Sequence, residues 1–115
     1  MPASVAYLTH DEVNAALACR MAKRFGLNLT VLAVKDANHA IAADQLVLDL
    51  DHLPLEYKSN LFLRIGRGEL RSGVAVHSYH LTPGECRALC TAGVRMTRRL
   101  TAAVLTPRMS ADSTT

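Results

Sequence analysis

The sequence of 115 residues contains no tryptophan, and its only aromatic residues are three tyrosines and two phenylalanines. Half of the residues are nevertheless hydrophobic, so alanine, leucine and valine must fill the interior. This composition is typical of helices that pack on a buried parallel sheet. The length suits one domain with a single core, which we expect over residues 1–106, followed by a disordered tail over residues 107–115.

Cysteines are few, and their number is odd: Cys19, Cys86 and Cys90. An odd count without disulfide-like spacing, in a chain with no signal peptide, predicts the reducing cytoplasm. Cys86 and Cys90 share one face of a predicted helix, and we interpret them as buried small hydrophobic residues because no further metal ligands are suitably spaced. No apolar stretch approaches the ~20 residues that span a bilayer, so no membrane association is expected.

Charge of neither sign dominates, because 13 basic residues face 10 acidic ones and the net charge is +3. One denser basic group consists of Arg95, Arg98 and Arg99. Together with Arg108 it could contact phosphates in a small nucleic-acid-binding α/β domain, which is our second alternative function. The basic excess is mild, so nucleic acid is not the expected partner.

Five short runs rich in apolar and β-branched residues predict β-strands. They alternate with segments of helical spacing, and this alternation predicts a doubly wound α/β domain with a five-stranded parallel sheet. The expected strands cover residues 4–8, 28–34, 46–49, 73–78 and 94–98.

The first expected helix follows the first strand through a capping box, in which Thr9 caps the helix and Glu12 lies three residues later. Gly26 supplies its end. Apolar residues recur at helical spacing and predict its buried face: Val13, Ala16, Leu17, Met21 and Phe25.

Later helices are expected over residues 39–43, where only a short one fits, and over residues 55–65, where glycines follow. The clearest helix start combines a cap, a proline at the first helical position and a glutamate that completes the box: Thr82, Pro83 and Glu85. Pro107 curtails the fifth helix, which we expect to be short or missing.

Polar residues stand where the predicted strands end. In open α/β sheets, ligands bind beyond the carboxyl ends of the strands. Asp49 closes the apolar run of the third strand and is therefore the first candidate for a functional residue, with Asp51 as a second. Ser78 ends the fourth strand and Arg98 the fifth.

The segments LVLDLDHLP, GVAVHSY and AGVRMTRRL resemble, in order and spacing, the receiver domain of two-component response regulators. The resemblance covers roughly residues 4–100 and implies the flavodoxin-like strand order 2-1-3-4-5. It implies that Asp49 is equivalent to the phosphoacceptor and that Ser78 binds the phosphoryl oxygens. Arg98 replaces the lysine of the family, and its planar guanidinium is no simple substitute for an ammonium group.

The sequence departs from the family where receivers hold Mg²⁺ between two acids at the end of the first strand. Thr9 and His10 occupy these positions, and Asp11 comes one residue later. Mg²⁺ requires oxygen ligands in tight octahedral geometry. A site built from Asp11 and Asp49, with Asp51 as a substitute ligand, is therefore kept as the alternative in which Asp49 is phosphorylated.

Histidines also lie near the predicted strand ends, and a transition-metal site or a pH-sensing role is a further hypothesis for them: His10, His52, His77 and His80. No tight pair with metal-ligand spacing is present among them, so this hypothesis is the weaker one.

The expected function is that of an atypical receiver-like signalling domain, a pseudo-receiver. Such a domain is no enzyme, needs no cofactor, and binds a protein partner (a kinase, an output domain or a second copy) independently of phosphorylation. Asp49 is then a retained carboxylate that pairs with Arg98. The expected docking surface is the fourth helix and fifth strand, with Arg87, Arg95 and Arg99 as partner-binding residues and an apolar edge left open by the stunted fifth helix.

Overall fold

The computed structural model describes residues 3–36, 43–70 and 73–106. The expected helix over residues 39–43 falls almost entirely outside this part of the chain, as does the expected tail over residues 107–115. The described strands and helices are β1 (Val5–Leu8), α1 (Glu12–Phe25), β2 (Leu29–Leu32), β3 (Gln45–Asp49), α3 (Leu55–Arg67), β4 (Val74–His77), α4 (Pro83–Thr91) and β5 (Arg95–Thr97). Two short 3₁₀ helices, Val34–Asp36 and Leu50–His52, follow β2 and β3.

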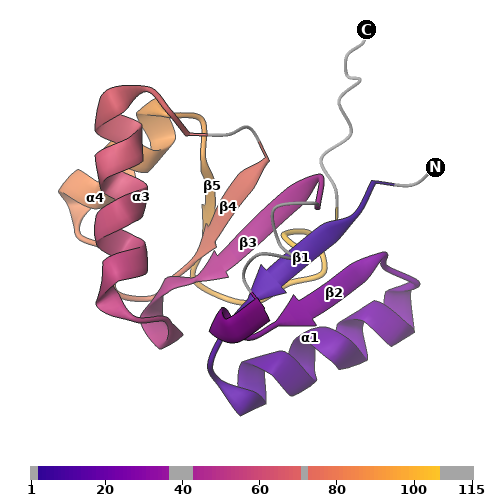
Figure 1. Ribbon diagram of the computed structural model, residues 1–115. Helices are drawn as coiled ribbons and strands as arrows, with labels where there is room; N and C mark the ends of the chain where they lie inside the picture. Colours follow the sequence, from indigo (N-terminus) through magenta and orange to yellow (C-terminus); the bar gives the residue numbers. More distant parts are fainter. Residues whose placement is uncertain (1–2, 37–42, 71–72, 107–115) are drawn as a thin grey trace, which may run out of the picture.

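All five strands are parallel and lie in the order β2-β1-β3-β4-β5, which confirms the predicted α/β architecture. Helices α3 and α4 cover one face of the sheet and α1 covers the other (Figure 1). In the register of the ladder, Leu8 lies opposite Leu48, and Asp49 lies opposite His77. The carboxyl ends of β1, β3 and β4 therefore meet at one edge of the sheet.

Each face of the sheet has its own hydrophobic core. Side chains from the strands pack with Leu61 of α3 and Leu89 of α4 on one face. On the other face, the strands pack with Ala18 of α1 and with Val104 and Leu105, which lie beyond β5. Within the described residues no helix follows β5, as expected, and residues 102–105 form turns. An irregular segment thus seals the face on which a fifth helix would pack.

Helix α1 differs from its prediction at both its start and its buried face. Asp11, not Thr9, is the N-cap, and its carboxylate accepts a hydrogen bond from the backbone N–H of Asn14 at 2.9 Å. Thr9 is buried just after the end of β1, where its hydroxyl donates a hydrogen bond to Asp49. Val13 and Phe25 are exposed, because the helix turns Leu17, Ala18 and Met21 toward the sheet.

The capping box of α4 is confirmed. The Thr82 hydroxyl accepts a hydrogen bond from the backbone N–H of Glu85, and the Glu85 carboxylate accepts one from the backbone N–H of Thr82. The interpretation of the cysteines on this helix is wrong for Cys90, which is exposed, whereas Cys86 is half-buried.

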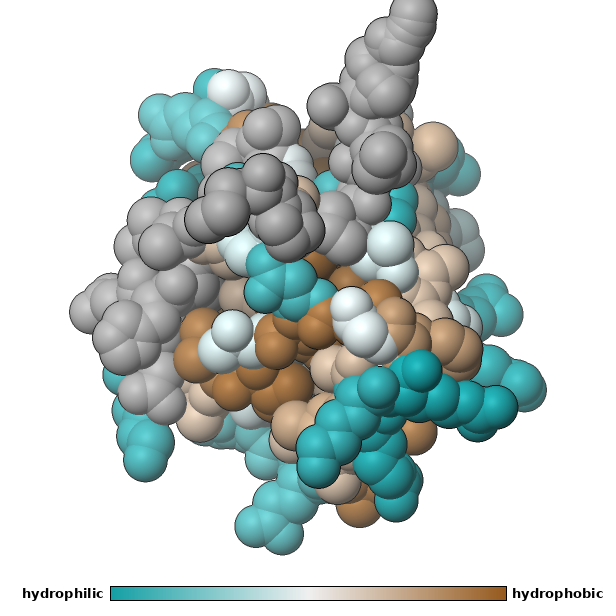
Figure 2. Space-filling model, turned by 90° about the vertical axis from the view of Figure 1, so that its right-hand side faces the viewer, coloured by the Kyte–Doolittle hydropathy of each residue, from teal (hydrophilic) through white to brown (hydrophobic). Residues whose placement is uncertain are grey.

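The amino ends of β1 and β2 lie on the right in Figure 1, and this side of the molecule faces the viewer in Figure 2. Apolar residues gather near its centre, and hydrophilic side chains project around its lower rim. Among the described helices, none combines the length and the apolar character that crossing a membrane requires. The polar strand ends lie at the opposite edge of the sheet.

Candidate functional site

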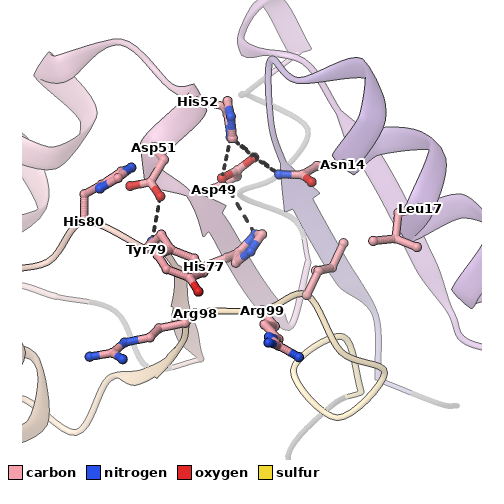
Figure 3. Close-up of a pocket in the computed structure, with 11 residues that line it drawn as sticks. Asn14, Leu17, Asp49, Asp51, His52, His77, Tyr79, His80, Arg98 and Arg99 are labelled. Atoms are coloured by element: carbon pink, nitrogen blue, oxygen red, sulfur yellow. Dashed lines mark hydrogen bonds and ion pairs between the residues drawn. The ribbon is translucent and has the colours of Figure 1, made fainter.

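A pocket of about 560 Å³ opens at the carboxyl edge of the sheet, where the structure brings together residues from three strand ends and from α1 (Figure 3). Doubly wound sheets commonly bind ligands at this edge. The pocket is lined by Asn14, Leu17, Asp49, Asp51, His52, His77, Tyr79, His80, Arg98, Arg99 and Leu100.

Asp49 lies at the floor of this pocket with an exposed fraction of 1%. Its Oδ2 accepts hydrogen bonds from the Thr9 hydroxyl at 2.7 Å and from the Asn14 side-chain amide at 2.9 Å. His52 Nδ1 lies 3.1 Å from Oδ2 and 3.2 Å from Oδ1. A buried carboxylate is stable only with such partners, and Asp49 has them from three different segments of the chain.

His52 is the exposed partner of this carboxylate, because 45% of its side chain is accessible. The oxygens of an ionised carboxylate only accept hydrogen bonds, so we assign a proton to Nδ1 of His52. The hydrogen bond to Asp49 raises the pKa of His52, with burial opposing it and the charges of Asp49, Asp11 and Asp51 reinforcing it. The pair is therefore a carboxylate–imidazole dyad that lines the pocket, with the carboxylate buried and the imidazole partly exposed.

A second histidine borders Asp49 from β4. His77 Nδ1 lies 3.7 Å from Asp49 Oδ1 and 2.8 Å from the Tyr7 hydroxyl. Tyr7 is buried in the centre of the sheet, and this burial, followed by the nearby Asp49 charge, raises the pKa of its phenol far above the usual range. Tyr7 therefore stays neutral and serves as a polar partner beneath the pocket.

The Ser78 hydroxyl is hydrogen-bonded to the carboxylate of Asp51 and not to that of Asp49. The hydroxyl donates to Asp51 Oδ1 at 2.6 Å, and the backbone N–H of Tyr79 donates to Asp51 Oδ2 at 2.6 Å. Burial alone would raise the pKa of Asp51, but these two hydrogen bonds outweigh it and lower that pKa. Asp51 thus ties the turn after β3 to the turn after β4.

The residues expected to hold Mg²⁺ do not fit the ion. The Asp11 carboxylate caps α1, and the Thr9 hydroxyl donates to Asp49 while accepting a hydrogen bond from the Asp11 N–H. His10 turns toward β2, where its Nε2 accepts a hydrogen bond from the backbone N–H of Val34. In the described part of the chain, no three His, Cys, Asp or Glu side chains are grouped to hold a metal ion. Neither the Mg²⁺ hypothesis nor the histidine-metal hypothesis gains support from this donor set.

No protein-family model, curated protein or solved structure matches the chain. The likeness to receiver domains therefore depends on the strand order and on the residues at the strand ends.

The expected ion pair between Asp49 and Arg98 is wrong. Arg98 and Arg99 are exposed in the loop after β5, and Arg98 points away from Asp49 in Figure 3. His52, Asn14 and Thr9 take the place of the arginine at the carboxylate. Arg98 and Arg99 are the first two residues after β5. The direction in which the chain turns there could not be predicted from the position of Arg98 in the sequence.

The basic residues expected to form one surface are separated. Arg87 is exposed on α4, whereas Arg95 is half-buried on β5 and its Nη2 donates to Gln45 Oε1 at 3.0 Å. Arg99 belongs to the pocket. Arg108 lies outside the described residues. Among the described arginines, only Arg98 and Arg99 line the pocket together, and this distribution lends the nucleic-acid hypothesis no support.

Two residues that contact Asp49 or extend its network were missing from the sequence-based site: Asn14 and Tyr7. His77 was named there only as one of four histidines near the strand ends, and not as a neighbour of Asp49. Asn14 carried a usable signal, because it lies one helical turn after a strand end that was already suspected. Tyr7 cannot be told from an ordinary strand residue in the sequence, since alternation along a strand does not show which polar side chain is buried beneath a pocket.

Proposed function

We propose that this chain is a receiver-like domain that binds a protein partner and does not use Asp49 as a phosphoryl acceptor. The observation that carries the proposal is the set of hydrogen bonds that enclose the buried carboxylate of Asp49. Both oxygens are engaged by hydrogen-bond donors, and the side chain is buried.

Electrostatics explains why this arrangement disfavours phosphoryl transfer to Asp49. A carboxylate that attacks a phosphoryl donor meets a negatively charged group, and receivers offset that repulsion with a metal ion. Here the donors around Asp49 stabilise its resting charge, and the Asp11 carboxylate is committed to capping α1. Asp49 is instead a structural acceptor that joins β1, α1 and the turn after β3.

The rim of the pocket is the surface best suited to a protein partner. Tyr79 is 61% exposed, and the exposed Arg98 and Arg99 line the same pocket. Tyrosine and arginine are the residue types that most often dominate binding at interfaces. By contrast, no large hydrophobic side chain of α4 or β5 in the described structure is strongly exposed, so the apolar edge expected there does not support docking.

The first test concerns Asp49. Adding Mg²⁺ and beryllofluoride to the isotope-labelled protein should leave the amide signals of Asp49, Ser78 and the following turn unchanged. NMR titration beside Asp49→Ala measures this directly. A saturable shift of those amides in the wild type that disappears in Asp49→Ala would show a working acceptor and contradict the proposal.

The second test concerns the rim. A photo-crosslinking amino acid that replaces Tyr79 in cells should join the chain to a specific protein. The same amino acid at Phe25 is the matched control, because Phe25 is an aromatic residue of α1 with a similar exposed fraction, 54%. Identical products from both positions, or none from Tyr79, would remove the rim as a docking surface.

A further inference from the structure

One nitrogen of the carboxylate–imidazole dyad remains free. Nδ1 of His52 is held by Asp49, whereas Nε2 has no hydrogen-bond partner among the described residues. With the proton on Nδ1, the neutral ring carries its lone pair on Nε2. The ring is 45% accessible and lines the pocket, so this lone pair can meet a small molecule there.

We propose that Nε2 of His52 is a phosphoryl acceptor for a small donor, an acyl phosphate or a phosphoramidate, that enters this pocket. The proposal goes beyond the function above, which assigns no reaction to His52. It also uses Asp49 in a role that its burial permits, because the carboxylate orients the imidazole without meeting the donor.

The reaction balances without a metal ion or an added proton. The lone pair of Nε2 forms a bond to phosphorus while the bond between phosphorus and the donor's leaving group breaks, which releases a carboxylate or ammonia. The proton on Nδ1 stays in place, and the ring becomes an imidazolium that bears the phosphoryl group. Its positive charge faces the Asp49 carboxylate, as the imidazolium faces the aspartate in hydrolase triads.

The pocket also supplies positive charge for the incoming phosphoryl oxygens. Arg98 and Arg99 line it and are permanently charged. Cations in a pocket attract an anionic phosphoryl donor and offset its charge. Asp51 lines the pocket too, but its two oxygens are occupied by Ser78 and by the backbone N–H of Tyr79.

The test is intact-mass analysis of the full chain after incubation with phosphoramidate or acetyl phosphate at about pH 8.5, where an ordinary histidine is neutral. We expect a gain of one phosphoryl group that is lost in acid and survives alkali, as the phosphorus–nitrogen bond of phosphohistidine does. The adduct should be absent from His52→Gln and present in His10→Gln, which replaces an exposed histidine outside the pocket.

The variant Asp49→Asn separates two roles of Asp49, the orientation of the His52 ring and the stabilisation of its positive charge. It keeps an acceptor beside Nδ1 but removes the charge that stabilises the imidazolium, so adduct formation should slow by about tenfold or more. Circular dichroism of each variant checks that the fold is retained. Failure of both donors to modify the wild type, or an adduct that survives in His52→Gln, would overturn the assignment of His52. An adduct that alkali removes and that persists in His52→Gln would overturn the proposed function as well, because it would lie on a carboxylate.

Discussion

Asp49 is a charged side chain that folding removes almost completely from water, and the Thr9 hydroxyl is its closest partner at 2.7 Å. A charge in that position is tolerated only while its donors remain. The same hydroxyl accepts a hydrogen bond from the backbone N–H of Asp11, so Thr9 joins the buried acid to the start of α1.

Thr9→Val should therefore lower the free energy of unfolding by about 1–3 kcal/mol, because it leaves two polar groups without their partner. Chemical denaturation measures the change. Thr30→Val is the matched control, since Thr30 is exposed on the edge strand β2 and its substitution should have an effect within about 0.5 kcal/mol. Equal effects at the two positions would mean that the hydroxyl of Thr9 has no special role.

At the scale of elements, the segment after β5 takes over the packing of a helix that does not form. Val104 and Leu105 are buried against the core that α1 shares with the sheet. Turns suffice here because the segment needs to place only a few apolar side chains over one face.

Leu105→Ala should thus destabilise the fold by about 2–5 kcal/mol, as the removal of a fully buried leucine side chain generally does. Leu55→Ala makes the same change at the exposed first residue of α3 and should cost less than about 0.5 kcal/mol. Thermal or chemical denaturation of the two variants compares them. A small effect of Leu105→Ala would show that the segment is dispensable.

The elements could be predicted from the sequence because their signals are local. The run Leu46–Leu48 before Asp49 belongs to a buried central strand, and the capping box at Thr82 fixes the start of α4. The start of α1 was predicted two residues too early, because Thr9 and Asp11 are both good caps. Only the end of β1 decides between them, by burying the threonine.

At the scale of the whole molecule, stability should depend on the proton that His52 holds. The hydrogen bond that His52 donates to Asp49, more than the charges of Asp11 and Asp51, raises the pKa of His52 on folding above its ordinary 6.5. Protonated His52 therefore stabilises the folded state fully below about pH 6.5, and this contribution is lost as the pH rises through the raised pKa.

Unfolding free energies measured across this pH range should fall with rising pH in the wild type and fall less steeply in His52→Gln. His10→Gln should retain the wild-type slope, because His10 does not contact Asp49. The contribution is modest, since His52 is half exposed to solvent. Identical slopes in all three proteins would contradict the coupling between His52 and Asp49.

The site was predictable in position but not in its contacts. Parallel strands bring their carboxyl ends to one edge, so Asp49 and Ser78 had to lie near each other. The turn over residues 50–53 sets the directions of the Asp51 and His52 side chains. As a result, Ser78 donates its hydrogen bond to Asp51, and His52 donates its hydrogen bond to Asp49. No sequence pattern encodes these side-chain directions.

Because the chain has no tryptophan, the fluorescence of its tyrosines can report on the pocket. Tyrosine emission is usually masked by energy transfer to tryptophan, but here three tyrosines emit alone. Tyr79 is exposed at the pocket, whereas Tyr7 is buried and Tyr57 packs against the core. A phosphoryl group on His52, or a protein bound at the rim, should change the surroundings of Tyr79, which lines the same pocket. Its fluorescence can therefore follow events at the pocket in the unlabelled wild-type chain.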